Sequence, residues 1–192
     1  MLFVMKEPQT RNAARTKDAV LTGAARALLA HGSAVTIAAI AEASGVSKGG
    51  VLHHFSTKEI LIKALAEDFL RQFREDVVRN VDLSENAPGK LLRAYVRTIS
   101  THARDLSATT MTESQWGILS LMPEVRAILD ADARRWREQF QEDGLHLDRI
   151  LVVTRAADGL AAAARDEASL TTDEVEHTTA ILLRMTFGDG PL

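Results

Sequence analysis

The chain has 192 residues, a net charge of −3, 46% hydrophobic residues and no cysteine. This length is sufficient for one or two compact domains with a buried core. The absence of cysteine from the sequence excludes disulfides, a cysteine nucleophile and cysteine metal ligands, and it is usual in cytoplasmic proteins, where we expect this chain. No apolar run approaches the ~18–20 residues that cross a bilayer, and residues 1–5 are too short for a signal peptide core, so we expect no association with membranes.

Charge is distributed unevenly along the sequence. Residues 1–60 contain seven Lys or Arg against four Asp or Glu, whereas residues 61–192 contain sixteen against twenty-two. A basic N-terminal segment on an acidic remainder is typical of a protein whose N-terminal part binds a polyanion. Charge alone would also fit the ordinary variation of a helical protein, so the interpretation depends on the motifs in the same segment.

Residues 1–9 are expected to be a disordered arm, and the first helix is expected from Thr10 to Ala30. Its apolar residues recur at helical spacing, and Gly32 follows where glycine commonly ends a helix. Four basic residues lie in the arm and near the start of this helix. They could contact the phosphates of a nucleic acid, or they could simply be solvated. The basic residues in question are Lys6, Arg11, Arg15 and Lys17.

Residues 36–59 predict two short helices joined by a tight turn; they read T-I-A-A-I-A-E-A-S-G-V-S-K-G-G-V-L-H-H-F-S-T-K-E. Gly45 supplies the permissive backbone that the turn requires. Thr36 is placed to cap the first of these two short helices. Ser47 is a good N-cap for the second, over about residues 47–54. The second helix would present small residues and a lysine at its N-terminal end, which is the end that a helix-turn-helix inserts into the DNA major groove.

The same stretch resembles the DNA-binding segment of the TetR/AcrR family of bacterial transcriptional repressors, over roughly residues 10–60. Leu52 departs from the family pattern, which usually has a tyrosine there that contacts the DNA backbone. Part of the phosphate contact that the resemblance implies is therefore missing or moved, with His53 as the candidate. The matching residues are Thr36, Ile40-Ala41, Gly45-Val46-Ser47, Gly49, His53-His54-Phe55 and Lys58-Glu59.

The motif and the resemblance together predict the residues that contact DNA. Lys48 is the side chain with an obvious capacity to read guanine. Thr36, His53 and Lys58 are expected to hold phosphates, Lys58 because it lies near the free amides at the start of the next helix. The adjacent His53 and His54 would point about 100° apart on a helix, so we expect no metal site there. The residues expected to approach base edges are Ser47, Lys48, Gly49 and Gly50.

A long helix is expected from Ser56 to about Val81. Ser56 and Glu59 form a capping-box sequence, with glutamate three residues after the serine and an apolar run following. At 1.5 Å per residue the helix would be roughly 35 Å long, enough to connect the N-terminal motif to a second domain and transmit movement between them. Its apolar residues recur every fourth position: Leu61, Leu65, Phe69, Phe73 and Val77.

Three further helical segments are expected after a loop at residues 82–89, namely residues 90–106, residues 107–122 and a helix opened by Pro123. The family resemblance implies a small-molecule pocket in this region, and aromatic and methionine side chains are common in pocket walls. The alternative is that these side chains form plain core. The expected lining residues are Tyr95, Ile99, His102, Met111, Trp116, Leu119, Met122, Trp136 and Phe140.

Two final helices are expected over residues 146–166 and, after a capping box at residues 171–174, to about Phe187. The first of them is rich in small residues that allow close helix packing. The resemblance implies that these helices form a four-helix dimer interface across a two-fold axis; the alternative is that they pack only on their own subunit. The expected interface residues are Leu147, Ile150, Leu151, Thr154, Ala157, Ala161, Val175 and Leu182.

The expected protein is therefore all-α, with a three-helix helix-turn-helix DNA-binding domain at residues 10–56 and a helical effector-binding and dimerisation domain at residues 57–188. We expect a transcriptional repressor that binds a near-palindromic operator in double-stranded DNA as a homodimer. A small apolar or aromatic effector would release it. The alternative is a helix-turn-helix protein that binds DNA or a partner without an effector. An enzyme is not expected, because the sequence has no phosphate-cradling glycine loop, H-E-x-x-H or G-x-S-x-G motif, and we expect neither cofactor nor metal.

Overall fold

A computed structural model describes residues 8–104, 113–166, 170–188, 190 and 192. Every regular element within these ranges is a helix, which confirms the all-α prediction. In chain order the elements are α1 (Pro8–His31), η1 (Gly32–Ala34), α2 (Ile37–Ser44), α3 (Lys48–His54), α4 (Lys58–Arg79), α5 (Lys90–Arg104), α6 (Glu113–Ser120), η2 (Pro123–Val125), α7 (Arg126–Glu142), α8 (Leu147–Asp166) and α9 (Thr172–Met185), where η denotes a short 3-10 helix.

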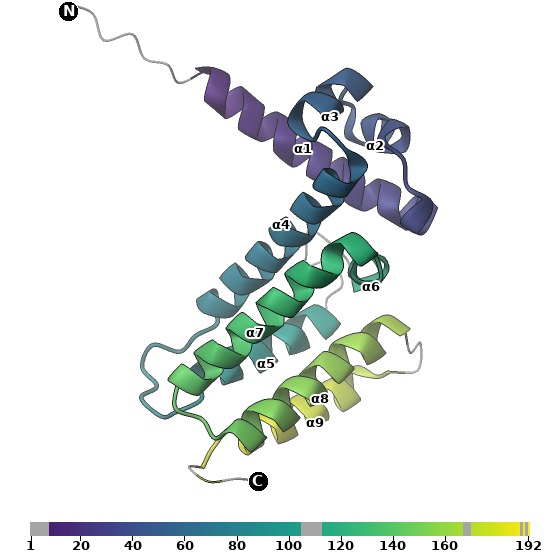
Figure 1. Ribbon diagram of the computed structural model, residues 1–192. Coiled ribbons are helices and arrows are strands. Elements are labelled where there is room, and N and C mark those ends of the chain that lie inside the picture. The colour runs from purple at the N-terminus through teal and green to yellow at the C-terminus, as the bar shows by residue number, and fades with distance from the viewer. Residues whose placement is uncertain (1–7, 105–112, 167–169, 189, 191) are drawn as a thin grey trace, which may run out of the picture.

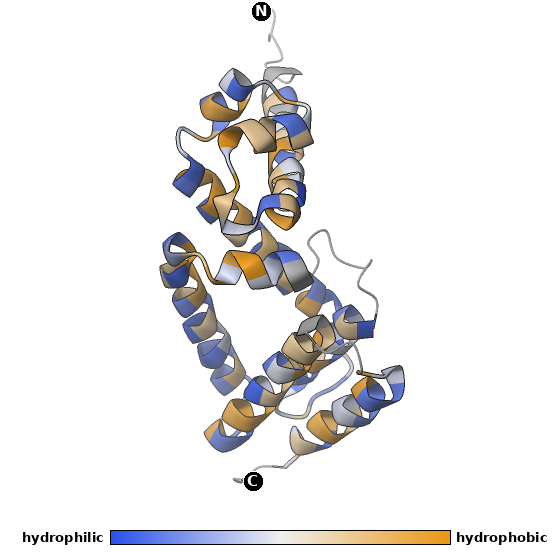
Figure 2. Cartoon of the chain, turned by 90° about the vertical axis from the view of Figure 1, so that its right-hand side faces the viewer, coloured by the Kyte–Doolittle hydropathy of each residue, from blue (hydrophilic) through white to orange (hydrophobic). Residues whose placement is uncertain are grey.

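The helices form two groups joined by α4 (Figure 1). Helices α1 to α3 make an N-terminal head, and α4 leaves the head and runs along the group formed by α5 to α9, which we call the C-terminal bundle. Within the bundle α5 packs against both α8 and α9, and α8 packs against α9. Hydrophobic and hydrophilic residues alternate along the helices, as expected of amphipathic helices that bury one face (Figure 2).

Each group of helices has a hydrophobic core of its own. The head core is built on buried residues such as Leu28, Ile40 and Val51, and the core of the bundle on residues such as Leu92 and Ile150. The head core also receives side chains from outside the head, because α6 and η2 fold back onto it. The three buried residues that they contribute are Leu119, Met122 and Val125.

Helices α1 and α2 approach each other very closely at one point. A β-carbon built on Gly23 would lie 2.4 Å from Cβ of Ser44, closer than two carbon atoms can approach. Only a residue without a side chain fits there, so Gly23 sets the distance between the two helices.

Several helix ends differ from the predicted positions. Helix α1 begins at Pro8, so Pro8 and Gln9 are helical although both were expected in the disordered arm; residues 1–7 lie outside the described residues. Proline is favoured in the first turn of a helix because its missing N–H is not needed there. Helix α4 begins at Lys58, and its N-cap is Thr57, not Ser56: the Thr57 hydroxyl oxygen accepts from Ile60 N at 3.2 Å. The predicted N-cap at Ser56 was therefore wrong by one residue.

The C-terminal half shows similar small shifts. Pro123 opens the 3-10 helix η2, and α7 begins only at Arg126, whereas one continuous helix was expected. The predicted capping box at Thr171 is confirmed, since Thr171 N donates to Glu174 Oε2 at 2.8 Å and Glu174 N donates to Thr171 Oγ1 at 3.2 Å. Helix α9 ends at Met185, two residues before the predicted end.

A buried arginine connects the loop before α5 to the end of α9. The Arg93 side chain is fully buried, with Nε 2.8 Å from Oε1 of Glu85. Its Nη2 donates to the Ala87 carbonyl, and its Nη1 donates to the carbonyl and hydroxyl oxygens of Thr186, all at 3.1–3.2 Å. Since a buried charge is tolerated only when it is paired and hydrogen-bonded, this arrangement fixes the far end of the bundle.

Candidate DNA-binding head and effector cavity

The helix-turn-helix is held by the residues that the sequence motif contains. The Thr36 hydroxyl oxygen accepts from Ala39 N at 3.2 Å and caps α2, and the Ser47 hydroxyl oxygen accepts from Gly50 N at 3.1 Å and caps α3. Gly45 ends α2 with φ +68°, in the left-handed region that favours glycine. These three residues set the angle at which α3 leaves α2.

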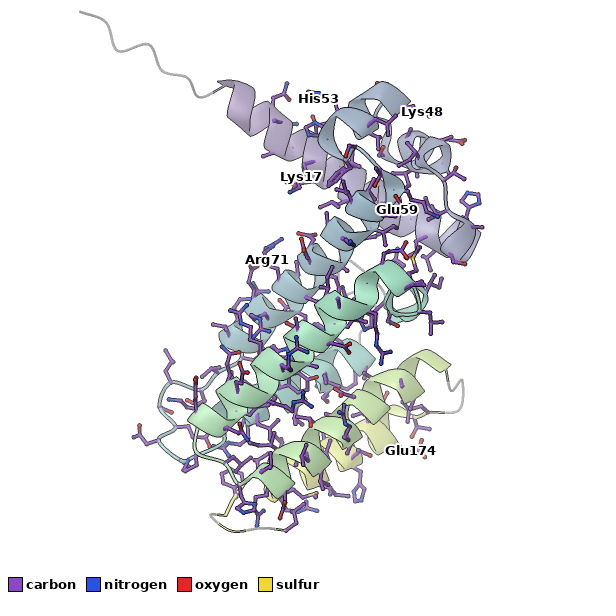
Figure 3. The ribbon with its side chains drawn as sticks, viewed as in Figure 1. Lys17, Lys48, His53, Glu59, Arg71 and Glu174 are labelled. Carbon is purple, nitrogen blue, oxygen red and sulfur yellow. The ribbon has the colours of Figure 1, made fainter. Side chains whose placement is uncertain are left out.

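Helix α3 buries one side and exposes the other. Val51 is fully buried and Phe55, at the end of the helix, is 3% exposed. Lys48, Gly49, Leu52 and His53 face solvent. Figure 3 places Lys48 and His53 on the end of the head farther from the C-terminal bundle, where a large partner can reach both.

The two glycines of α3 have different surroundings. A β-carbon on Gly49 would meet nothing within 4 Å, whereas one on Gly50 would lie 2.9 Å from Cγ1 of Val46 and 3.2 Å from Oγ of Ser47. Gly50 is therefore required by packing inside the head. Gly49 is not, so its exposed backbone is free to lie close to a partner.

The remaining predicted contacts lie around α3. His53 is exposed and His54 is half-buried, with their ring centroids 5.5 Å apart. Lys58 donates from Nζ to the Ser33 carbonyl at 3.3 Å, which directs its ammonium toward the loop before α2. Lys17 on α1 is exposed and lies 5.9 Å from the ring centroid of Phe55 (Figure 3). A basic surface thus extends from α3 onto α1.

The C-terminal bundle encloses a cavity of about 330 Å³ between α4, α5, α6, α7 and α8. Its wall includes six of the nine predicted lining residues: Tyr95, Ile99, His102, Trp116, Trp136 and Phe140. Leu119 and Met122 do not line it, because the fold of α6 and η2 onto the head buries them in the head core. Met111 lies outside the described residues.

Aromatic rings dominate the cavity wall. Trp136 and Phe140 on α7 are stacked with centroids 5.4 Å apart, and the ring of Tyr95 meets both edge-on at 5.3 and 5.5 Å. Phe73 on α4 meets the Tyr95 ring at 5.4 Å. Such a wall favours an apolar or aromatic ligand, since ring edges and faces offer both dispersion and quadrupole contacts.

Two carboxylates of the wall are held by neighbouring donors. Asp132 pairs with Arg74 at 2.5 Å, and the Arg74 guanidinium also stacks on Trp136 at 4.0 Å from the ring centroid. Asp158 accepts a hydrogen bond from the Tyr95 hydroxyl at 2.7 Å. Burial raises the pKa of Asp158, and burial together with the nearby Asp158 carboxylate raises the pKa of Tyr95 well above its usual value.

A histidine also lies in the wall. His102 on α5 is 7% exposed, and its Nε2 lies 3.3 Å from Oδ2 of Asp76 on α4. Burial lowers the pKa of His102 and outweighs the opposing effect of Asp76. In the described residues no group of three or more histidine or acidic side chains could hold a metal ion.

Two family models match the chain, one over the N-terminal part and one over the C-terminal part. The family model described as "Bacterial regulatory proteins, tetR family" matches residues 20–65, and the model described as "Tetracyclin repressor-like, C-terminal domain" matches residues 89–187. The chain belongs to the TetR family of bacterial regulatory proteins. It is therefore a DNA-binding regulator of transcription, and the helix-turn-helix is the part that the first model covers.

Individual TetR-family relatives are similar along most of the chain. The HTH-type transcriptional repressor AcnR of Corynebacterium efficiens is 28% identical over 147 residues, covering 69% of this chain and 74% of that protein. AcnR of Corynebacterium diphtheriae is 29% identical over 162 residues, covering 74% and 82%. Among solved structures, a transcriptional regulator from Rhodococcus sp. Rha1 has a TM-score of 0.66 at 20% identity, covering 91% of this chain and 95% of that one. At such identity the structural likeness concerns the fold alone.

Two helices that complete the cavity wall, α4 and α8, were not expected there. Phe69 and Phe73 of α4 line it, as do Leu151, Thr154 and Ala161 of α8, which were expected at a dimer interface. The apolar residues of α4 were recognised from their spacing, but spacing does not show which neighbours a helix face meets. On α8 the wall residues recur three and four positions apart, which is a signal for one helix face.

The other residues expected at a dimer interface divide into two groups. Ile150, Ala157, Val175 and Leu182 are at most 3% exposed within the single chain, so their side chains pack inside it. Leu147 remains 44% exposed. Two further apolar side chains are exposed although neither was expected at the interface: Val152 in α8 and Phe187 just beyond α9. Within the part of the chain that the structure describes, no helix has the length and apolarity to cross a membrane.

Proposed function

We propose that this TetR-family protein represses transcription by binding a near-palindromic operator as a homodimer, and that a small molecule in the cavity releases it. The observation that carries the DNA-binding part is the exposed N-terminal end of α3, where Lys48 and Gly49 stand clear of the rest of the head. A helix-turn-helix reads the major groove with this end. Repression is also the activity named for the AcnR relatives.

The proposed DNA contacts follow from the surroundings of each residue. Lys48 would donate to guanine, and the bare backbone at Gly49 would lie against the DNA surface. Thr36, Ser47 and His53 are exposed and would donate to phosphates or base edges. The hydroxyl oxygens of Thr36 and Ser47 accept capping bonds but leave their protons available, and Leu52 offers an apolar contact in place of the family's tyrosine.

Lys58 and Lys17 would add phosphate contacts at the sides of α3. The Lys58 ammonium has three protons and uses one on the Ser33 carbonyl, so two remain for a phosphate near the start of α4. Lys17 extends the basic surface along α1. These contacts would supply affinity that falls with rising salt, because each one releases counterions from the DNA.

Dimerisation would bring two heads to one operator. The exposed apolar side chains Leu147, Val152 and Phe187 lie in α8 or just beyond the end of α9, the two helices expected at the interface. A two-fold dimer there would bury them and present two α3 helices to half-sites about 34–36 Å apart.

We place the division between head and effector domain near residue 57, and we place the protein in the cytoplasm with its DNA.

Release would operate through helices that touch both the cavity and the head. Trp116 of α6 lines the cavity and stacks on Phe69 of α4 with centroids 4.3 Å apart. The neighbouring Gln115 donates from Nε2 to the Ala25 carbonyl of α1 at 2.8 Å. A ligand that displaces Trp116 would therefore strain the head, and it releases DNA only if it binds the released state more tightly.

The DNA-binding part is tested by binding of the protein to its own upstream DNA across a salt series. Tight, steeply salt-dependent binding to one near-palindrome is expected, and Lys48→Ala should weaken it about tenfold, the usual range for a base contact. Arg134→Ala, on the exposed side of α7, is the control and should bind like wild type. Equal binding to all sequences, unchanged by Lys48→Ala, would contradict the proposal.

The alternative is a DNA-binding protein that responds to no effector. The cavity favours the effector-controlled protein, because a concave site lined by aromatic side chains with a few polar groups is the usual form of a small-molecule site. Fluorescence of Trp116 and Trp136 discriminates between the two, since both indoles line the cavity. A ligand that quenches them and lowers operator affinity would support the proposal.

A further inference from the structure

One arginine in the cavity wall has no partner among the described residues. Arg137 of α7 is half-buried and lines the cavity, yet it forms no ion pair or hydrogen bond with any residue that the structure describes. Its guanidinium carries five N–H donors and a charge that is never lost. A partner for these donors has to come from solvent or from a ligand.

The other charges of the wall are matched. Asp132 is paired with Arg74 at 2.5 Å. Asp158 accepts from the Tyr95 hydroxyl and lies 3.7 Å from Arg155. Among the described residues, Arg137 is therefore the charged side chain of the cavity wall that has no oppositely charged neighbour.

Arg137 lies next to the aromatic part of the wall. On α7 it follows Trp136 directly and precedes Phe140 by three residues, and all three side chains line the same cavity. Residues three apart on a helix are neighbours on its surface. A ligand that packs on these rings therefore reaches Arg137 with a group at its end.

We propose that the effector is an amphipathic carboxylic acid, whose aromatic or aliphatic body packs on the rings of Trp136 and Phe140 and whose carboxylate binds Arg137. The inference rests on the proposed function of the cavity as the effector site. A planar guanidinium forms two parallel hydrogen bonds with a carboxylate, and a partly desolvated site strengthens them. The volume of about 330 Å³ limits the acid to a small one.

A cationic ligand does not fit the same arrangement. It would bring a second positive charge toward Arg137, while the two carboxylates that could attract it already accept from Arg74 and Tyr95. A neutral ligand would leave the Arg137 guanidinium partly desolvated beside it without a charged acceptor. Of the three classes, the acid alone supplies what the wall lacks.

Three probes with one apolar body test the proposal: phenylbutyrate, phenylbutanol and phenylbutylamine. Quenching of Trp116 and Trp136 in the full-length protein gives the affinity of each. Phenylbutyrate should bind about tenfold or more tightly than the other two, the range expected of a charge-assisted hydrogen bond. Arg137→Gln should remove this preference and leave the affinity for phenylbutanol unchanged, and Arg137→Lys should restore part of it.

Arg134→Gln is the matched control, since Arg134 is on the same helix but exposed and outside the cavity wall. It should retain the full preference for the acid. If phenylbutanol binds and phenylbutyrate binds no better, or Arg137→Gln leaves the acid's affinity unchanged, the inference is overturned while the cavity remains a ligand site. If none of the three probes binds, both the inference and the proposed effector site are overturned.

Discussion

The head and the C-terminal bundle are organised by different kinds of interaction. In the head, Thr36, Gly45 and Ser47 fix the helix-turn-helix through hydrogen bonds and backbone angles within a few residues of themselves. In the bundle, the cavity depends on residues such as Phe73 and Trp136 that are far apart in the sequence. The head is therefore specified locally, whereas the bundle is specified by how whole helices pack. Substitutions that remove a local interaction in the head, or a long-range interaction in the bundle, can show how much each kind contributes to stability.

The largest expected effect is on the bundle. Arg93→Met should lower the free energy of unfolding by about 3–5 kcal/mol, because it leaves Glu85 and the Thr186 carbonyl without their buried partner. Urea unfolding followed by circular dichroism measures the change. Arg134→Met, at an exposed position, is the control and should stay within about 0.5 kcal/mol of wild type. A similar small change for Arg93→Met would show that long-range pairing is not what holds the bundle.

The next effect is on packing within the head. Gly23→Ala should destabilise the protein by about 1–3 kcal/mol, since its β-carbon would overlap Ser44 and push α1 away from α2. The same urea experiment measures it. An unchanged midpoint would mean that the two helices separate without cost.

A substitution of a second head glycine should separate stability from binding. Gly49→Ala adds a methyl group where nothing lies within 4 Å, so stability should be unchanged or rise by about 0.5–1 kcal/mol from the better helix former. Operator affinity should fall about tenfold, because the methyl group meets the DNA surface. Titration of labelled operator DNA measures this. Wild-type affinity for Gly49→Ala would show that the α3 backbone does not approach the DNA closely.

The smallest effect concerns the start of α4. Thr57→Ala should cost about 1 kcal/mol by removing the cap on Ile60 N, while Ser56→Ala at the adjacent exposed position should change stability by less than about 0.5 kcal/mol. Thermal unfolding of the two variants side by side tests the assignment. The reverse order would restore Ser56 as the cap.

The sequence was sufficient for the elements whose causes are local. The turn at Gly45, the caps Thr36 and Ser47 and the capping box at Thr171 were all predictable, because each depends on residues three or four positions apart. Ser56 was mistaken for the cap of α4, since both Ser56 and Thr57 have hydroxyls and only the backbone conformation decides between them.

Features that depend on the packing of whole helices were predictable only in part. Leu119 and Met122 were placed in the cavity wall because they share a segment with Trp116, but α6 turns one face to the cavity and another to the head. For Leu151 and Ala161 of α8, the spacing of the residues indicates a helix face but does not show whether that face meets a partner subunit or an internal cavity. Arg137 carried no signal at all, because an arginine on a polar helix is ordinary until its neighbours are known.

The burial of Leu119, Met122 and Val125 in the head core has a consequence for modularity. A fragment ending in α4 would lack these side chains and would expose the apolar surface that they cover. Exchanging heads between relatives would succeed only when the segment from Gln115 to Val125 is exchanged with them, since Gln115 also binds the Ala25 carbonyl. The structural unit that contains α3 is thus discontinuous in sequence. Because α6 belongs to this unit and also lines the cavity, substitutions in it are expected to change DNA binding and effector binding together.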